Sequence, residues 1–208
     1  MRQNVIMITI VYIIAGYLMG SILFASLFTK WIHGIDLAKE SKDGNPGTAN
    51  AFMQGGFACG VLSLVCDLGK GFLPVYFYVR EPATQLGIGL VLVMIAPVLG
   101  HAYSIYHHFD GGKCIAVSFG VLLGLVPDMA PVVLLAFFYI LFSILRIQPH
   151  SRRTFAAFIA SSVASFFCLK EKMIVAAMCM MSFVVLHKHA VQERRQIVGE
   201  MEQEELRR

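Results

Sequence analysis

Seven apolar runs cover most of the chain, and short polar segments separate each run from the next. A helix needs about 20 apolar residues to cross the hydrocarbon core of a bilayer. The longer runs reach that length and predict transmembrane helices, whereas the shorter runs 114–127 and 154–169 leave a full crossing open. The runs are 4–28, 54–79, 85–104, 114–127, 129–147, 154–169 and 172–188.

The composition also indicates that these helices lie in a lipid bilayer. Of 208 residues, 57% are hydrophobic and 14% are charged, whereas soluble domains carry about 25% charged residues. We therefore predict an all-α, polytopic membrane helical bundle with about seven transmembrane helices. We expect a single integral-membrane domain at 1–190 and a charged cytoplasmic tail at 191–208. The first run lacks a charged leader and a cleavage site, so we interpret it as a retained helix.

The basic residues are distributed unequally between the two ends of the predicted helices. Twelve Lys and Arg residues fall in the loops 29–53, 104–113 and 146–153 or in the tail, and four fall on the opposite side. Because cytoplasmic loops are enriched in Lys and Arg, we predict an outside N-terminus and a cytoplasmic C-terminus. The net charge of +4 is modest, and we predict no nucleic-acid partner.

The five cysteines have no paired spacing and mostly lie inside apolar runs. This distribution is typical of small buried apolar residues. We therefore predict no disulfide, no metal site and no cofactor.

The segment from Lys42 to Asn50 combines turn-forming residues with backbone N–H groups just before an apolar run. Amide groups at a helix start bind anions. Gly44, Asn45 and Gly47 are therefore candidates for a phosphate site, although an ordinary turn between helices has the same composition.

A second glycine loop, Phe109 to Lys113, adds a cation to two glycines. It is not a nucleotide-binding P-loop, because His107 stands at the first glycine position and Cys114 at the Ser/Thr position. A phosphate-sized anion remains compatible with this loop.

Several polar residues lie where lipid is expected. Asp67 and Lys70 are three residues apart and share one helix face, and charges at membrane depth normally face a partner or a cavity. They are either a mutually neutralising pair or part of an anionic substrate site. His101 follows Gly100 at the end of a run, and Ser21 follows Gly20 inside one; both residue types also occur as structural groups.

Four motifs in this order resemble the bacterial acyl-phosphate:glycerol-3-phosphate acyltransferases, the PlsY family. The resemblance extends from Gly16 to about Gly199, nearly the whole chain. The matching segments are Gly20-Ser21-Ile22, Gly44-Asn45-Pro46-Gly47 with Asn50, Asp67-Leu68-Gly69-Lys70-Gly71, and Gly100-His101 followed by Phe109-x-Gly111-Gly112-Lys113.

The resemblance implies transfer of a fatty acyl group from acyl-phosphate to the 1-hydroxyl of glycerol-3-phosphate, which yields lysophosphatidic acid and phosphate. It implies a multi-pass protein of the bacterial cytoplasmic membrane with its active site facing the cytoplasm. Its implied catalytic residues are Ser21, His101 and Lys113. The implied glycerol-3-phosphate site comprises Lys39, Gly44, Asn45, Gly47, Asn50 and Lys70. The implied acyl-phosphate site comprises Gly111, Gly112 and Lys113.

The chain also departs from the family pattern and so resembles a divergent member. Asp43 replaces a serine beside the proposed phosphate site, a repulsive change unless Lys39 or Lys42 neutralises it. Lys39 itself replaces an arginine and loses bidentate geometry. The other departures are Ser104 for Pro, Cys114 for Gly, Val117 for Thr, Ala156 and Ile159 for two serines, and Gln192 for Asn.

The sequence bears on three other functions. A catalytically impaired paralogue that acts as a partner or regulator of lipid synthesis is favoured by Asp43 and by the missing serines. A small transporter would need polar residues at the midplane of several spans, and only Asp67 and Lys70 fit. Acyltransferases with a His-x4-Asp motif are excluded, because no His here has Asp five residues later.

Overall fold

The computed structural model describes residues 2–41, 43–84 and 87–206, and every regular element within these ranges is a helix. The all-α prediction is confirmed. The elements are α1 (Arg2–Gly20), α2 (Phe24–His33), α3 (Leu37–Glu40), α4 (Thr48–Tyr78), α5 (Ile88–Ala102), the 3-10 helix η1 (Ile105–His107), α6 (Ile115–Leu123), α7 (Ala130–Ile144), α8 (His150–Cys168) and α9 (Lys172–Leu206).

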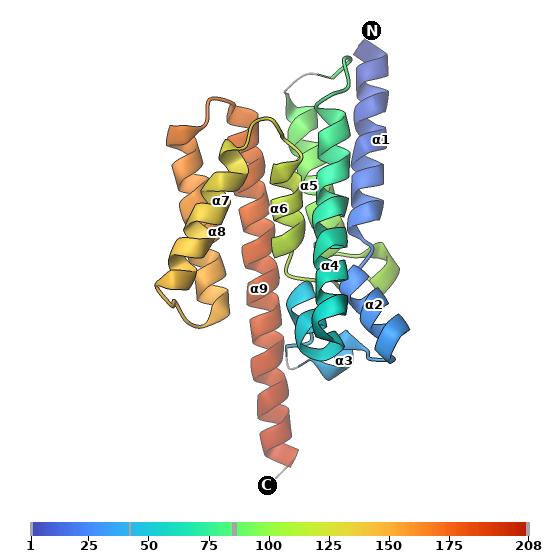
Figure 1. Cartoon of the computed structure of the whole chain (residues 1–208), viewed down its shortest axis with the longest axis vertical. Helices are drawn as coiled ribbons and strands as arrows, with labels where there is room; N and C mark the ends of the chain where they lie inside the picture. The colour runs from blue at the N-terminus through green and yellow to red at the C-terminus, as the bar shows by residue number, and fades with distance from the viewer. Residues whose placement is uncertain (1, 42, 85–86, 207–208) are drawn as a thin grey trace.

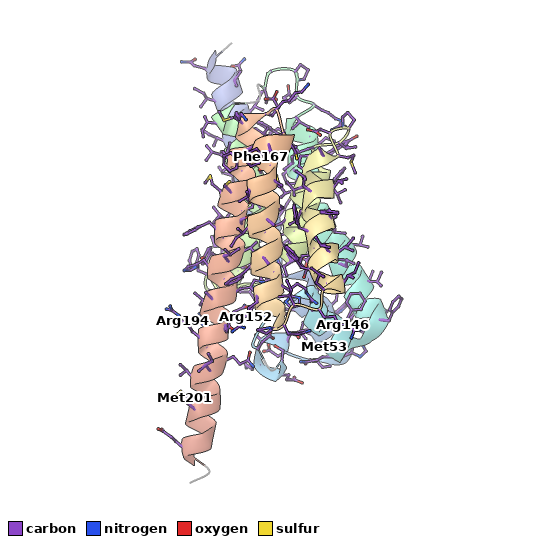
Figure 2. The ribbon with its side chains drawn as sticks, turned by 90° about the vertical axis from the view of Figure 1, so that its left-hand side faces the viewer. Met53, Arg146, Arg152, Phe167, Arg194 and Met201 are labelled. Carbon is purple, nitrogen blue, oxygen red and sulfur yellow. The ribbon has the colours of Figure 1, made fainter. Side chains whose placement is uncertain are left out.

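The long helices run in alternating directions, so the polar segments gather at one end of the bundle (Figure 1). The N-terminus lies at the opposite end, and α9 projects beyond the rest at the polar end. Arg146, Arg152 and Arg194 lie toward this polar end, whereas Phe167 lies near the other (Figure 2). The basic residues are therefore grouped in space as they are grouped in the sequence.

The described helices differ in whether they are long enough for a full crossing. Among the described residues, four segments have the length and composition of membrane spans: Gln3–His33, Thr48–Tyr78, Ile88–His107 and Lys172–Val198. α7 is apolar but shorter. α6 has 9 residues, which span only about 14 Å of a roughly 30 Å hydrocarbon core. The prediction of about seven transmembrane helices is therefore supported for four long segments, and full crossing by the shorter helices stays a prediction.

The first apolar run does not form a single continuous helix. α1 ends at Gly20, and α2 begins at Phe24. The carbonyl of Ser21 accepts a hydrogen bond from Ser104 Oγ at 2.6 Å, and the carbonyl of Ile22 accepts one from Lys70 Nζ at 2.6 Å. Distant side chains thus satisfy two backbone acceptors that the break leaves open.

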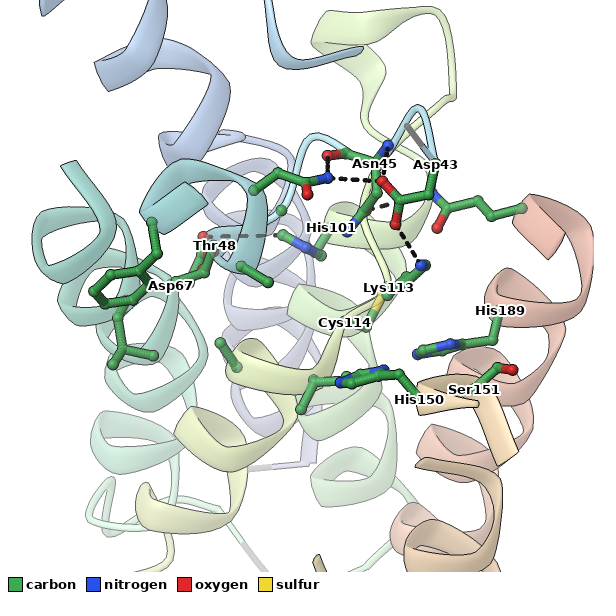
Figure 3. Close-up of a pocket in the computed structure, with 18 of the residues that line it drawn as sticks. Asp43, Asn45, Thr48, Asp67, His101, Lys113, Cys114, His150, Ser151 and His189 are labelled. Atoms are coloured by element: carbon green, nitrogen blue, oxygen red, sulfur yellow. Dashed lines mark hydrogen bonds and ion pairs between the residues drawn. The ribbon is translucent and has the colours of Figure 1, made fainter. Parts of the chain in front are cut away.

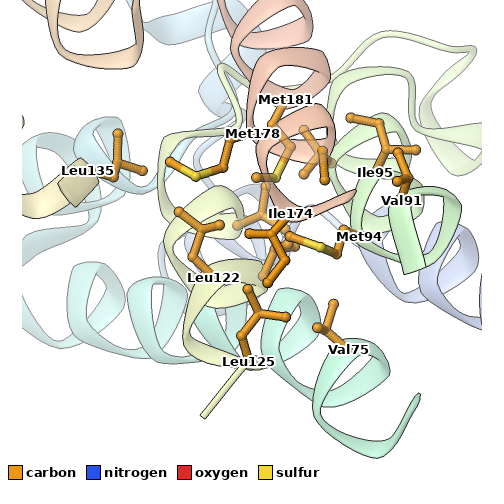
Figure 4. Packing of buried hydrophobic residues seen from close by; sticks show 14 of the residues in the cluster. Val75, Val91, Met94, Ile95, Leu122, Leu125, Leu135, Ile174, Met178 and Met181 are labelled. Carbon is orange, nitrogen blue, oxygen red and sulfur yellow. The ribbon is translucent and has the colours of Figure 1, made fainter. Parts of the chain in front are cut away.

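The apolar core lies where α4, α5, α6 and α9 meet (Figure 4). Val75, Met94, Leu122 and Ile174 each contribute from one of these helices and are at most 4% exposed. A helix that is apolar on all sides belongs inside a bundle, and α5 fits that description. The helices that flank the cavity therefore rest on a packed centre.

Glycines let two pairs of helices approach closely. A Cβ on Gly20 of α1 would lie 2.7 Å from Cα of Pro97 in α5, and a Cβ on Gly71 of α4 would lie 2.9 Å from the amide nitrogen of Val121 in α6. Small residues at such crossings are typical of membrane helix packing. These contacts hold α1 on α5 and α4 on α6.

Large apolar side chains also cover the outside of the bundle. Ile6, Phe77, Ile140 and Phe183 are all more than half exposed. Exposed apolar surface on this scale fits a lipid environment. α9 continues without a break through 191–206, so the residues assigned to a tail extend the last helix, and the division at residue 190 stays a prediction.

Candidate active site

A cavity of about 990 Å³ lies between the 43–50 segment, α4, α6, α7, α8 and α9 (Figure 3). This volume is typical of small-molecule sites. One part of the lining is polar and the other is apolar. The polar residues include Asp43, Asn45, Thr48, Asn50, Asp67, His101, Lys113, His150, Ser151, His189, Gln192 and Glu193. The apolar residues include Phe52, Met53, Leu64, Leu68, Ile115, Phe119, Leu123 and Tyr139.

An ion pair between Asp43 and Lys113 lies at the polar part of the cavity. Asp43 Oδ2 is 2.7 Å from Lys113 Nζ. Asp43 Oδ1 accepts hydrogen bonds from Asn50 Nδ2 at 2.7 Å and from the Asn45 N–H at 3.2 Å. Partial burial alone would raise the pKa of Asp43, but Lys113, Asn50 and Asn45 together hold it below its ordinary value. Asp43 is therefore a carboxylate at neutral pH.

The 43–50 segment has the tight geometry that its composition predicts. Gly44 adopts φ +60°, a left-handed conformation that glycine adopts without steric cost. Asn50, in the first turn of α4, donates from Nδ2 to the Asn45 carbonyl at 2.7 Å. Asn50 thereby ties the turn to the helix that follows it.

A second polar network is buried between α4 and α5. Lys70 Nζ lies 2.8 Å from Asp67 Oδ1 and 2.8 Å from His101 Nδ1, and donates to the Ile22 carbonyl. Thr48 Oγ1 donates to the other Asp67 oxygen at 2.8 Å. Because an ammonium only donates, His101 accepts at Nδ1 and carries its ring proton on Nε2. All three Lys70 donors are thus directed to protein groups.

Side chains of α9 hold the 109–113 loop in place. Asp110 lies 3.1 Å from Lys188 Nζ and 2.6 Å from Arg195 Nη1. Gln192 Nε2 donates to the Gly111 carbonyl at 3.2 Å. Lys188, Gln192 and Arg195 lie on one face of α9, because they are four and three residues apart. The last helix therefore positions the loop that carries Lys113.

His189 contributes polar atoms that lack a partner. Its side chain is 1% exposed, and neither ring nitrogen has a hydrogen-bond partner among the described residues. The ring stacks on that of His150, with centroids 6.1 Å apart, and both rings lie near Lys113 (Figure 3). The two ring nitrogens are therefore available to a water molecule or a ligand in the cavity.

The apolar wall follows α6. Ile115, Phe119 and Leu123 line the cavity at intervals of four residues, so they share one face over about 12 Å. The Phe119 ring meets the Tyr139 ring of α7 edge to face, with centroids 6.0 Å apart. An extended apolar surface thus begins beside Lys113 and leads away from it.

A comparison with known families assigns the chain. A family model described as glycerol-3-phosphate acyltransferase matches residues 10–199. The chain belongs to the glycerol-3-phosphate acyltransferase family. The predicted resemblance, and with it the predicted activity class, is confirmed.

Individual relatives agree with this assignment. A glycerol-3-phosphate acyltransferase of Bacillus cytotoxicus is 34% identical over 186 residues, with 88% of each chain covered. One from Pseudomonas aeruginosa is 43% identical over 126 residues, which cover 59% of this chain and 62% of the relative. The similarity therefore extends over most of the chain.

Solved structures of PlsY, described as an integral membrane glycerol 3-phosphate acyltransferase, have the same fold. The lysophosphatidic acid form has a TM-score of 0.76 at 25% identity, and the glycerol 3-phosphate form has a TM-score of 0.77 at 26% identity. Each comparison covers 92% of both chains. The predicted integral membrane character is confirmed at this level.

Five of the residues predicted for the acyltransferase site line the cavity. Lys113, His101 and the turn around Asn45 come together there although the sequence separates them widely. The five are Asn45, Gly47, Asn50, His101 and Lys113.

Ser21 and Lys39, also predicted for the acyltransferase site, lie outside the cavity lining. Ser21 is fully buried at the break after α1, where its Oγ donates to the Tyr17 carbonyl at 2.8 Å. The Lys39 side chain is 83% exposed and lies 3.8 Å from Asp36. Both side chains are engaged elsewhere.

Lys70 and three predicted glycines also lie outside the lining. Lys70 is enclosed by the partners described above. Gly111 and Gly112 pack against His101, and a Cβ on Gly112 would strike its Nε2. Gly44 shapes the turn by its positive φ. These residues support the lining from behind.

The partner of Asp43 differs from the prediction. Lys39 or Lys42 was expected to neutralise it, and Lys42 lies outside the described residues, but Lys113 forms the ion pair. The expectation for Lys39 is wrong because its side chain is 83% exposed and its ion pair is with Asp36. The Lys113 ammonium, which was predicted to bind acyl-phosphate, is therefore already paired with Asp43.

Other departures from the acyltransferase pattern have clear positions. Cys114 keeps a left-handed backbone, φ +64°, in which the family's glycine would be unstrained. Sequence reasoning gave no site role to four residues that line the cavity: Tyr139, His150, Ser151 and His189. The family position held by Gln192, three residues after His189, was the available signal, but only the fold brings α8 and α9 to the cavity.

Proposed function

We propose that this chain transfers a fatty acyl group from acyl-phosphate to the 1-hydroxyl of glycerol-3-phosphate and releases lysophosphatidic acid and inorganic phosphate. The observation that carries the proposal is one cavity with a polar, donor-rich part that contains Lys113 and an apolar wall that begins beside it. Such a cavity suits two phosphorylated substrates, one of which has a long hydrocarbon chain.

The two parts of the cavity divide the work of binding. Phosphate groups take the donors of Lys113, Asn45, Asn50 and His189. The acyl chain lies along the α6 face that ends at Leu123. Binding in this way brings the hydroxyl to the carbonyl carbon, and such positioning supplies much of the rate enhancement.

The reaction needs stabilisation of negative charge more than a protein nucleophile. The glycerol hydroxyl oxygen attacks the acyl carbon, the bond from that carbon to the phosphate oxygen breaks, and negative charge develops on the carbonyl oxygen. Fixed N–H donors and the Lys113 ammonium stabilise that charge. Phosphate leaves as a stable anion.

His101 acts as a donor in this proposal. Its Nδ1 accepts from Lys70, so Nε2 carries the ring proton and lies against Gly112. Lys70 and Asp67 are positioning residues, because they set this tautomer. The hydroxyl proton then leaves on the phosphate product.

We further propose that the protein lies in the bacterial cytoplasmic membrane, with the cavity facing the cytoplasm and the N-terminus outside. The support is the grouping of Arg146, Arg152 and Arg194 toward the polar end, since basic residues favour the cytoplasmic side. Because the two termini lie on opposite sides in this topology, the shorter helices α6, α7 and α8 carry the chain between the two sides together with the segments that flank them.

One observation favours the alternative of an impaired paralogue that serves as a partner or regulator of lipid synthesis. Lys113 is already neutralised by Asp43, 2.7 Å away. In the paralogue reading, that pair never opens and no product forms.

The two readings separate in a direct assay. Purified protein in lipid receives glycerol-3-phosphate with either acyl-phosphate or acyl-CoA, and lysophosphatidic acid is measured. We expect product with acyl-phosphate and its loss in Lys113→Ala. Cys59→Ala is the control, because Cys59 is buried in α4 and does not line the cavity, and it should stay within a few-fold of wild type. No product from the wild type would refute the acyltransferase proposal.

A further inference from the structure

Asp43 holds the same donors that a bound phosphate needs. Its two oxygens accept hydrogen bonds from Lys113 Nζ at 2.7 Å, from Asn50 Nδ2 at 2.7 Å and from the Asn45 N–H at 3.2 Å. Lys113 and Asn50 belong to different elements, and both point at this one carboxylate. Asp43 therefore acts as an anion already bound in the site.

The charge balance of the cavity makes this occupation important. Among the described residues that line it, Lys113 is the one Lys or Arg, whereas three are acidic: Asp43, Asp67 and Glu193. Asp67 is neutralised by Lys70. While Asp43 stays on Lys113, the cavity offers an incoming phosphate no unpaired ammonium.

The pair is built so that it can open. The side chains of Asp43 and Lys113 are 27% and 20% exposed, so water reaches both. If the lysine turns away, Asp43 keeps its hydrogen bonds to Asn50 and the Asn45 N–H. The ion pair with Lys113 is therefore the first contact that an incoming phosphate has to displace.

We infer that Asp43 is an internal counter-ion that a phosphate must displace from Lys113, so that it sets the affinity of this site for phosphorylated ligands. The inference rests on the proposed function for the identity of the substrates. A doubly charged phosphate ester with further contacts in the cavity competes well with one carboxylate. Inorganic phosphate has fewer contacts and competes poorly, which limits inhibition by this product.

Direct binding of inorganic phosphate tests the inference without any acyl transfer. Isothermal titration calorimetry would compare the full chain in lipid nanodiscs as wild type, Asp43→Asn and Asp43→Ser. We expect both variants to bind phosphate at least about fivefold more tightly, the factor that one like charge about 4 Å away contributes even in bulk water. Glu193→Gln is the matched control, because it removes a lining carboxylate without freeing Lys113, and it should change the affinity less than twofold.

Kinetics supply a second readout. Displacement predicts that Asp43→Asn lowers KM for glycerol-3-phosphate or acyl-phosphate and strengthens phosphate inhibition, with little change in kcat. A residue that merely supported the loop would lose kcat and thermal stability instead.

The outcomes are distinct. Phosphate binding that is unchanged, weaker or undetectable in both Asp43 variants overturns the inference, even if the wild type makes lysophosphatidic acid. Tighter binding in the variants upholds it, even if the wild type makes no product and the proposed function fails. An equal gain in Glu193→Gln would also overturn it, since general charge and not the Asp43–Lys113 pair would then control binding.

Discussion

Replacing Gly71 with alanine should force α4 and α6 apart. A Cβ on Gly71 would lie 2.9 Å from the Val121 amide nitrogen and closer still to the Val117 carbonyl oxygen. Both are backbone atoms of α6, so no side chain can rotate to relieve the contact. From the other side, Gly120 packs in the same way on the Leu68 backbone.

The size of the effect follows from two opposing terms. Overpacking a tight contact costs about 1–3 kcal/mol, whereas alanine gains about 0.5–1 kcal/mol over glycine inside a helix. Gly69 lies two residues earlier in α4, and nothing lies within 4 Å of a Cβ placed there. Gly69→Ala therefore measures only the stabilisation that alanine gives over glycine inside a helix. We expect Gly71→Ala to be less stable than Gly69→Ala by about 1–3 kcal/mol, the cost of the backbone contact.

The assay is thermal unfolding of both variants and the wild type in one detergent at one heating rate. For a chain of this size, each kcal/mol corresponds to about 2–4 °C in midpoint. We expect Gly71→Ala to unfold below wild type and Gly69→Ala at or above it. If the two alanine variants unfold at the same temperature, the backbone contact between α4 and α6 is refuted.

Two further predictions concern the 109–113 loop and the apolar wall of the cavity. Asp110→Asn should lower the thermal midpoint at pH 7, because it breaks the ion pairs to α9. Burial alone would raise the pKa of Asp110, but its basic partners hold it below the ordinary 3.8. The stabilisation is therefore fully present above pH 3.8 and is lost as pH falls through the lowered value, so a gap between variant and wild type that persisted well below that value would contradict the assignment. Leu123→Trp should shorten the apolar wall and reduce turnover of long-chain acyl-phosphates by about fourfold per excluded methylene, since each is worth about 0.8 kcal/mol; equal losses with short and long chains would mean that the acyl chain lies elsewhere.

The helices themselves were largely predictable from the sequence. Long apolar runs form helices in a bilayer because backbone groups must be satisfied within the segment. The exception is the first run, which breaks between Gly20 and Phe24. That break is stabilised by Lys70 and Ser104. Because these residues lie far along the chain, no local sequence pattern predicts the break.

The candidate site was predictable in part. Asn45, Asn50, His101 and Lys113 were identified from motifs, and all four line the cavity. Lys39 was also identified, yet its side chain points to solvent. A motif indicates which residue types occur together, but it does not say which way a side chain points.

The sequence by itself determined that the helices lie in a bilayer, which family the chain belongs to and which end of the bundle carries the polar loops. Each follows from a property of the chain: the length of the hydrophobic runs, the order of the motifs and the distribution of charge. Only the tertiary structure decided which charges meet. Lys113 pairs with Asp43 across 70 residues, Lys70 is turned inward to His101 and the broken helix, and α9 brings His189 to the cavity. Ion pairs and cavities depend on distances between segments remote in sequence, and packing alone sets those distances.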